Sequence, residues 1–336
     1  MMKAFAERYL PALDSLLREI VCGAPRAPGF NVQLEYPMGW VDADGYPVHL
    51  SGGKRIRPLL LLLCAEATGN AWEPALPAAA SVELIHNFSL VHDDIEDASP
   101  LRHGRPTVWQ QWGLENAINT GDALFALAYT AMGHLHGRVP DSVAVKAYAI
   151  LNETNLLLTR GQHLDMRFER QPVVTVDEYL TMIEGKSAAL LAAAAQLGAL
   201  IGSGDSDAAA IYHRFGTNLG IAFQIRDDIL GIWGDPAVTG KSAATDILSR
   251  KKSLPVLFAL ERSGALRSLY AQEPFGDAEV AAAIQLLDEL GAQVYAKEQE
   301  TIFHQRALEA LQSAGDTGPA SESLLELMES LLGRAA

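Results

Sequence analysis

Apolar residues recur at helical spacing along most of this chain. In residues 3–21 they follow helical periodicity, and a further helix is predicted from Pro58 to about Thr68. The same pattern predicts helices over residues 75–98, 107–135, 141–170, 175–202, 205–232, 253–263, 276–312 and 319–333. A short β-rich run, VVTV at 173–176, follows Pro172 and does not sustain an alternation of period two. The pattern therefore predicts an all-α chain of about ten helices.

Proline and glycine interrupt this pattern most strongly near the beginning of the chain. Residues 23–53 are rich in both types relative to their flanks, which predicts a long loop, and long loops in compact domains are often functional. No low-complexity tract or clear linker divides the remaining sequence. Residues 1–336 are therefore expected to form a single helical domain.

An acidic run, Asp93-Asp94-Ile95-Glu96-Asp97, lies at the end of the predicted helix over 75–98. Pro100 ends that helix, and Asp93 and Asp97 share a face because they are four residues apart. Carboxylates gathered there repel one another and face the negative end of the helix dipole, so a cation would stabilise them. Magnesium fits, since it is usually held by one or two carboxylates plus substrate phosphates. The alternative is a solvated acidic helix end with no ligand.

A second acid pair, Asp227-Asp228, repeats this design. It follows an apolar helical stretch, and Gly231, Gly234 and Pro236 break the helix soon afterwards. Helical bundles build metal sites from inward carboxylates on facing helices. One acidic helix end is ordinary, but two of the same design favour a metal site.

Positive residues stand near both acid pairs in the sequence. In Gly52-Gly53-Lys54-Arg55-Ile56-Arg57-Pro58, the glycines let a backbone approach a ligand, and the cations stand at a helix start that itself favours anions. Arginine also binds phosphate oxygens in a bidentate way. Read alone, this stretch could equally be a flexible basic loop. Further cations occur in Arg102-His103-Gly104-Arg105, Lys186-Ser187, Lys241 and Lys251-Lys252. Together with the acids, they predict a magnesium-bridged polyphosphate ligand.

Composition excludes several other classes of protein. A formal net charge of −15 over 336 residues argues against a nucleic-acid binder, which needs a basic face. Cys22 and Cys64 are too few for a disulfide scaffold. The amphipathic N-terminus carries acidic residues early and resembles neither a signal nor a transit peptide. The most apolar windows, Leu59–Ala65 and Ala188–Ile201, are shorter than the roughly 20 residues of a membrane span. A soluble cytoplasmic protein is expected.

The ordered set of motifs resembles the trans-type isoprenyl diphosphate synthases, the polyprenyl synthetase family. The resemblance covers residues 50–256 continuously. It rests on GGKRIRP, ELIHNFSLVHDDIED, GQHLD (161–165), GKS (185–187), FQIRDD (223–228), GDPAVTGK (234–241) and TDILSRKKSLP (245–255). The tryptophan-bearing version DDILGIWGDP looks like the geranylgeranyl diphosphate synthases of the short-chain group.

The resemblance implies an isoprenoid synthase-type bundle of mostly antiparallel helices around a deep central cavity, generally as a homodimer. Such enzymes join an allylic diphosphate (dimethylallyl, geranyl or farnesyl) to isopentenyl diphosphate, with about three Mg²⁺ ions per active site when diphosphate is bound. Breaking the allylic C–O bond puts negative charge on the leaving diphosphate, which metal and fixed cations stabilise. The carbocation left behind needs a cavity that excludes water.

The family's residue roles carry over only to matching positions of this sequence. Metal binding falls to Asp93, Asp97 and Asp227, with Asp94 and Asp228 assisting. Allylic diphosphate binding falls to Arg102, Lys186 and Lys241, and isopentenyl diphosphate binding to Lys54, Arg57 and His86. Ser187 and Gln224 are expected near the carbocation, with Gln162 as a further substrate-binding residue.

A lone histidine on an apolar helix is more often a packing residue, but His86 lies two turns before Asp93 and close to the same face, which favours binding. Trp109, Trp112 and Trp233 are expected to pack.

Two positions depart from the family pattern. Gly231 stands where the second acidic motif usually ends in a third aspartate, so Asp246 or Asp235 is a candidate to help through water. His103 stands where a second arginine is usual, which predicts weaker isopentenyl diphosphate binding that improves at mildly acidic pH. A His103→Arg variant whose Michaelis constant and pH dependence stay unchanged would contradict this hypothesis.

Product length is expected to depend on Phe88 and Ser89, which precede Asp93 by five and four residues. By resemblance, a bulky aromatic with a small neighbour favours a geranylgeranyl product, with farnesyl and geranylfarnesyl diphosphate as alternatives. A class I terpene cyclase also uses a magnesium-bound acidic motif, but would not need GGKRIRP with His86. A non-catalytic partner subunit and a structural helical protein are the remaining alternatives.

Overall fold

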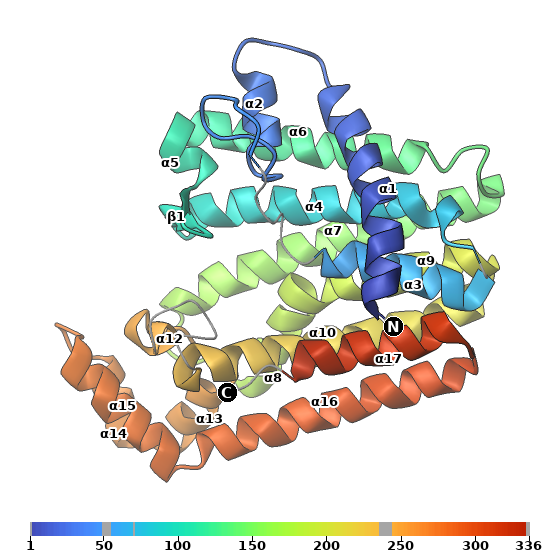
Figure 1. The fold of residues 1–336 in the computed structure, drawn as a ribbon. Coiled ribbons are helices and arrows are strands. Elements are labelled where there is room, and N and C mark those ends of the chain that lie inside the picture. The colour runs from blue at the N-terminus through green and yellow to red at the C-terminus, as the bar shows by residue number, and fades with distance from the viewer. Residues whose placement is uncertain (1, 49–54, 70, 235–243, 334–336) are drawn as a thin grey trace. The chain divides into compact units, whose positions relative to one another are not determined.

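The computed structural model describes residues 2–48, 55–69, 71–234 and 244–333, and helices make up most of this part of the chain (Figure 1). The all-α prediction is confirmed. The chain forms two compact units. The first comprises Met1–Leu151, Ala194–Ala210 and Asp316–Leu324, and the second comprises Asn152–Ala193, Ile211–Gly315 and Leu325–Ala336. A single domain over residues 1–336 stays a prediction.

The first unit holds the N-terminal helices and the first acidic run. Its elements are α1 (Met2–Cys22), α2 (Phe30–Glu35), α3 (Ile56–Gly69), a 3-10 turn (Glu73–Ala75), α4 (Leu76–Glu96), β1 (Leu101–Arg102), β2 (Arg105–Pro106), α5 (Val108–Trp112) and α6 (Leu114–Gly133). Parts of α7 (Asp141–Arg170), α9 (Ala189–Ser203), α10 (Ser206–Trp233) and α17 (Pro319–Leu332) complete it.

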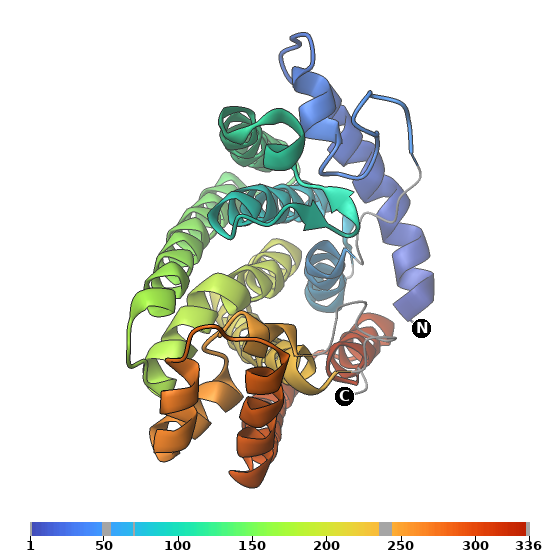
Figure 2. The ribbon, with the colours of Figure 1, turned by 90° about the vertical axis from the view of Figure 1, so that its left-hand side faces the viewer.

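Helix α4 is the centre of the first unit. Every residue from Pro77 to Ile85 is buried, which its mostly small or apolar side chains allow. Helix α4 packs most extensively against α6, and also against α3 and α1; Figures 1 and 2 show α4 and α6 side by side. Burying each large apolar side chain contributes roughly 1.5–3 kcal/mol, so the helix that ends in the acidic run is held firmly at its N-terminal half.

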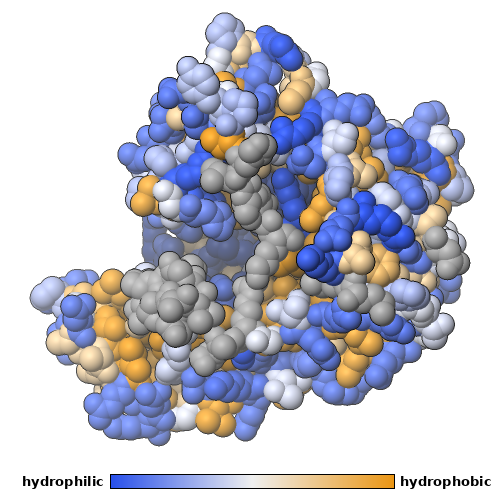
Figure 3. Space-filling model, in the orientation of Figure 1, coloured by the Kyte–Doolittle hydropathy of each residue, from blue (hydrophilic) through white to orange (hydrophobic). Residues whose placement is uncertain are grey.

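The second unit holds the second acid pair. It contains the remainder of α7, α9, α10 and α17, together with α8 (Val176–Ile183), a π-helical segment (Glu184–Ala188), α12 (Thr245–Leu248), α13 (Leu254–Arg262), α14 (Gly264–Tyr270), α15 (Asp277–Glu289) and α16 (Ala292–Ala314). Ile247, Val256, Leu266 and Leu287 belong to a buried cluster that joins α12, α13, α14 and α15. Figure 3 shows one face of the molecule, on which hydrophilic residues predominate and smaller apolar areas lie between them.

Several helix predictions needed correction. The stretch 107–135 is two helices, and 276–312 is also two, because Gly113 (φ +89°) and Gly291 (φ +72°) adopt backbone conformations that interrupt a helix and favour glycine. The predicted loop 23–53 contains α2, and the short helices α12 and α14 were missed. The described residues also contain one small sheet: β1 and β2 pair antiparallel, and at two residues each they are too short to show an alternating pattern.

The helical run Val176–Ser203 is the one stretch, among the described residues, that is long and apolar enough by composition to cross a membrane. It has 28 residues, and 78% of its most apolar window is buried inside the structure. Such burial is typical of a core helix.

Candidate active site

The first acidic run lies at the C-terminal end of α4. The Asp97 amide donates to the Asp93 carbonyl at 2.9 Å, so helical geometry continues through residue 97 and the two side chains share a face. Asp94 is buried, whereas Asp93 is half-buried and Asp97 is exposed. A ligand can therefore approach the outer two carboxylates more readily than the middle one.

A tight hairpin after α4 brings Arg102 to Asp94. His103 (φ +52°) and Gly104 (φ +76°) form the two-residue loop between β1 and β2, the left-handed geometry typical of a type I′ turn. Arg102 Nε lies 2.9 Å from Asp94 Oδ1 and 3.1 Å from Oδ2, and its terminal nitrogen lies 3.8 Å from Asp93 Oδ2. Burial raises the pKa of Asp94, and the Arg102 guanidinium opposes that rise. Arg102 is thus bound to the middle acid of the motif.

The start of α3 meets α4 through Arg57 and His86. Arg57 Nη1 lies 3.2 Å from His86 Nε2; because arginine only donates, that histidine nitrogen must accept and the ring is neutral. Burial, together with Arg57, Arg102 and Arg55, lowers the pKa of His86 well below its ordinary value. Two predicted isopentenyl diphosphate ligands are therefore brought together by the fold. The third, Lys54, lies outside the described residues.

Arg55, although it stands in the same basic stretch, has a structural partner. Its Nη1 donates to Glu83 Oε1 at 2.6 Å, and both side chains are almost fully buried. Asn87 Nδ2 donates to the same carboxylate oxygen at 3.1 Å. Glu83 was not predicted from the sequence. The signal for it was a single acidic residue among the apolar positions of the predicted helix over 75–98, since a buried charge needs a partner.

Phe88 and Ser89 both lie half-buried on α4. The Phe88 ring contacts Phe125 of α6 edge-on at 5.1 Å between centroids, and contacts His92 at 4.8 Å. Ser89 Oγ donates to the His86 carbonyl at 2.8 Å, which keeps this small side chain close to its own helix. The bulky residue is therefore braced by α6, and the small one leaves space beside it.

A π-helical segment carries Lys186 and Ser187. Such segments are rare and frequent at functional sites. It lies directly against α7: a Cβ on Gly161 would stand 2.1 Å from the Lys186 amide nitrogen, so only glycine fits there. Lys186 Nζ binds Asp165, one turn beyond Gly161. Gln162, between them on α7, is half-buried. The helix predicted over 175–202 contains this bulge, which periodicity alone could not show.

Gln224 reaches Ser187 because α10 lies close to the same segment. A Cβ on Gly220 would stand 2.5 Å from Ala188 Cα, and Gln224 follows one turn later on the same face. Ser187 Oγ donates to Gln224 Oε1 at 2.6 Å. The two residues predicted near the carbocation are thus hydrogen-bonded to each other.

The second acid pair divides into one half-buried and one buried aspartate. Asp227 is half-buried, whereas Asp228 is 1% exposed. Tyr179, missed by sequence reasoning, donates its hydroxyl to Asp228. Burial raises the pKa of Asp228, while Lys251 and Tyr179 oppose the rise. Burial works against the charge of Lys251, but Asp228, Asp246 and Asp227 together raise its pKa above the ordinary value. Lys251 therefore stays positive.

Asp246 lies where a side chain at position 231 would stand. A Cβ on Gly231 would be 2.5 Å from Asp246 Oδ2, and Lys251 Nζ lies 3.6 Å from the same oxygen. The Asp246 carboxylate therefore lies beside position 231, and its help to the second motif stays a prediction. Asp235 and Lys241 lie outside the described residues.

The donor set of each motif suits a hard divalent cation. In the part of the chain that the structure describes, no three or more His, Cys, Asp or Glu side chains gather to hold a metal by themselves. Asp93 with Asp97, and Asp227 on its own, instead offer one or two carboxylates each. This is the pattern of magnesium, which completes its shell with water and substrate phosphates.

The tryptophans behave as packing residues. Trp109 Nε1 donates to the Ser99 carbonyl at 2.8 Å, and the Trp112 ring meets Tyr36 edge-on at 4.9 Å. In the second unit, Trp233 Nε1 donates to Asp288 Oδ1 at 2.9 Å. Each tryptophan fastens neighbouring segments.

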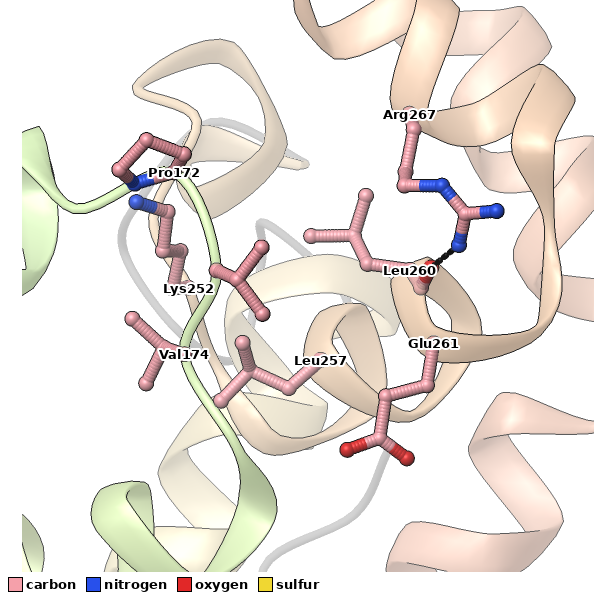
Figure 4. Close-up of a pocket in the computed structure, with 8 residues that line it drawn as sticks. Pro172, Val174, Lys252, Leu257, Leu260, Glu261 and Arg267 are labelled. Carbon is pink, nitrogen blue, oxygen red and sulfur yellow. Dashed lines mark hydrogen bonds between the residues drawn. The ribbon is translucent and has the colours of Figure 1, made fainter.

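A separate pocket of about 380 Å³ lies in the second unit, beside the segment that precedes α8 (Figure 4). Its apolar wall includes Val174, Leu257 and Leu260. Its two cations already have partners, since Lys252 Nζ donates to carbonyls at the end of α7 and Arg267 donates to the Leu260 carbonyl. Among the described residues predicted to stand near the polyphosphate ligand, Lys252 is the one that lines this pocket, where it binds backbone carbonyls instead.

Comparisons with known proteins agree on one family. The Polyprenyl synthetase family profile matches residues 45–287. A geranylgeranyl diphosphate synthase of Mycobacterium tuberculosis is 47% identical over 237 residues, covering 70% of this chain and 67% of that protein. A (2E,6E)-farnesyl diphosphate synthase of the same species is 40% identical over 295 residues, covering 84% and 81%. The crystal structure of polyprenyl synthetase from Streptomyces coelicolor A3(2) has a TM-score of 0.90 and 37% identity, covering 99% of this chain and 100% of that one.

Proposed function

Because this chain belongs to the polyprenyl synthetase family, we propose that it makes geranylgeranyl diphosphate from an allylic diphosphate and isopentenyl diphosphate. The chain is a short-chain trans-prenyl diphosphate synthase and therefore a transferase, as the motifs predicted. The allylic substrates proposed are dimethylallyl, geranyl and farnesyl diphosphate.

The observation that carries the proposed product length is the pair Phe88 and Ser89 on α4. Phe88 is braced against Phe125, while the neighbouring position carries only a hydroxymethyl group. One bulky and one small residue would let a chain grow further than two bulky residues would. Farnesyl diphosphate is the second candidate product, because a relative of that name is 40% identical over 84% of this chain.

The first unit is proposed to hold the metal-bound face of the allylic diphosphate and the isopentenyl diphosphate. Asp93 and Asp97 would bind Mg²⁺, because they are the accessible aspartates of the run and share a helix face. Arg102 would fix Asp94 and present its remaining donors to the allylic diphosphate. Arg57 and His86, with Lys54, would bind isopentenyl diphosphate. Among the described residues, Arg57 Nε is buried without a hydrogen-bond partner, so an incoming oxygen would satisfy it.

The second unit is proposed to bind the leaving group and face the cation. Asp227 would bind a further Mg²⁺, and Lys186 and Lys241 would bind the allylic diphosphate. The polar oxygens of Ser187 and Gln224 would face the developing positive charge. Mg²⁺, when bound, neutralises negative charge on the diphosphate as it leaves.

The reaction then follows from the groups in place. The allylic C–O bond breaks, its electron pair leaves with the diphosphate, and the cations stabilise the product anion. The isopentenyl double bond attacks the allylic carbon, and a proton is lost, with the departing diphosphate as the proposed base. No side-chain nucleophile is required.

Three broader expectations remain proposals. A homodimer is expected from the family, and α6 and α7 expose apolar side chains that a second copy could cover, namely Ile118 (41% exposed) and Val145 (68% exposed). A cytoplasmic location is proposed from the composition of the sequence, and a single domain over residues 1–336 is proposed because no clear linker divides the sequence.

One assay separates the alternatives. Purified protein is incubated with Mg²⁺, farnesyl diphosphate and labelled isopentenyl diphosphate, and the dephosphorylated products are separated by chromatography. A C20 product supports the proposal. If label is incorporated only when a shorter allylic primer replaces farnesyl diphosphate, and the product stops at C15, the result supports a farnesyl diphosphate synthase. A hydrocarbon made from farnesyl diphosphate alone would indicate a cyclase, and no turnover with any primer a partner subunit.

A further inference from the structure

Asp228 is surrounded by hydrogen-bond donors on both oxygens. Its Oδ1 lies 3.0 Å from Gln224 Nε2 and 3.8 Å from Lys251 Nζ. Its Oδ2 accepts from the Tyr179 hydroxyl, and from the Leu254 amide at 3.0 Å. Only 1% of Asp228 is exposed, so donors of the protein occupy most lone pairs of its carboxylate oxygens and few remain for a ligand.

This arrangement decides which way the Gln224 carboxamide is turned. An ionised carboxylate can only accept, so the NH₂ group of Gln224 must face Asp228 and its oxygen must face the other way. That oxygen accepts from Ser187 Oγ at 2.6 Å. If the amide were reversed, two acceptors would meet at Asp228. The carboxylate therefore fixes the direction of the Gln224 dipole.

We infer that Asp228 and Tyr179 are positioning residues that hold the Gln224 oxygen toward the reacting carbocation. This inference rests on the proposed function, in which Gln224 faces that cation. A fixed carbonyl oxygen stabilises positive charge without having to reorient during the reaction. A reversed amide would direct N–H groups at the cation and destabilise it.

Tyr179 is held in place by the start of its own helix. Thr175 and Glu178 form a capping box at the N-terminus of α8, and the Tyr179 amide donates to the Thr175 carbonyl at 3.0 Å. The side chain is 1% exposed, and burial together with Asp228 raises the pKa of its phenol well above the ordinary value. Tyr179 therefore remains a neutral donor.

The decisive experiment reverses the direction of the hydrogen bond between Asp228 and Gln224. In Asp228→Asn, the backbone amide of Leu254 cannot turn around, so the new NH₂ group is expected to face Gln224 and turn its amide over. We expect kcat to fall by about 100-fold, with Michaelis constants for both substrates within about threefold. Adding Gln224→Glu places one carboxylate oxygen against the new NH₂ group and leaves the other oxygen facing the carbocation. The kcat of this double variant should be at least about tenfold higher than that of Asp228→Asn.

Tyr179→Phe keeps the charge of Asp228 and removes one donor, so kcat should fall by about tenfold with little change in the Michaelis constants. Tyr270→Phe is the matched control, because that buried hydroxyl has no hydrogen-bond partner in the described part of the chain and its loss should leave kcat unchanged. Circular dichroism establishes that each variant is folded.

A double variant no faster than Asp228→Asn, or a Tyr179→Phe enzyme with the kcat of the parent, would overturn the inference. Failure of the parent enzyme to elongate any allylic diphosphate would instead overturn the proposed function.

Discussion

The three aspartates of the first run divide into two outer acids that a ligand can approach and a middle acid bound by Arg102. Asp93→Ala and Asp97→Ala should each lower kcat by about 100-fold or more, because an oxygen ligand of the metal is lost. Initial rates at saturating substrate and Mg²⁺ measure this. Glu298→Gln, an exposed acid on α16, is the control. Rates within threefold of the parent for both variants would remove the first run from the site.

His86 makes stability depend on pH. Its pKa is lowered in the folded protein by burial and by arginines, so the unfolded chain binds a proton more readily. The stability held by neutral His86 is therefore present above about pH 6.5 and is lost as the pH falls. Between pH 7 and 5.5, the parent should lose about 1 kcal/mol more unfolding free energy than His86→Gln. Urea unfolding at both pH values tests this, and equal losses would contradict a neutral His86 ring.

At the scale of elements, close helix packing places the polar groups of the second unit. A Cβ at Gly220 would stand 2.5 Å from Ala188 Cα, a backbone atom that cannot swing away. Gly220→Ala should therefore destabilise the protein by about 1–3 kcal/mol and lower kcat by moving Gln224 away from Ser187. Gly264→Ala, where the nearest atom is 3.7 Å away, should change neither quantity. Urea unfolding and initial rates give the comparison, which fails if the two variants behave alike.

Helix α4 also carries the residues proposed to set product length. Ser89→Phe should shorten the product, because a second bulky ring would stand beside Phe88. Phe88→Ala should lengthen it, because the ring braced on Phe125 is removed. Chromatography of the dephosphorylated products reads the outcome. An unchanged chain length in both variants would place the determinant elsewhere.

Much of this architecture could be predicted from the sequence, and the misses share a physical cause. Long periodic stretches were correct, such as 141–170, which matches α7 residue for residue. Breaks set by a single glycine conformation were missed, as at Gly113, because periodicity continues across them. At the site, the motifs named residues that the fold brings together, such as Ser187 with Gln224, but partners distant in the sequence stayed hidden. Tyr179 is 49 residues from Asp228, and no local pattern links a tyrosine to an acid at that distance.

At the scale of the whole molecule, charge explains why a metal is expected. In the first run Asp93 and Asp94 share Arg102, and in the second unit Asp165, Asp227, Asp228 and Asp246 face Lys186 and Lys251. A diphosphate is itself an anion, so it would be repelled by the excess of carboxylates. Divalent cations reverse the sign of that interaction at each acid pair.

A double-mutant cycle tests whether the two acid pairs act on one ligand. Inorganic diphosphate with Mg²⁺ should raise the melting temperature of the parent, because a ligand that binds only the folded state stabilises it by mass action. If one metal–diphosphate cluster uses both motifs, Asp93→Asn and Asp227→Asn should each abolish most of the shift, and the double variant should lose little more. EDTA should abolish the shift in the parent. Two independent sites would instead give losses that add, with each single variant keeping about half of the shift.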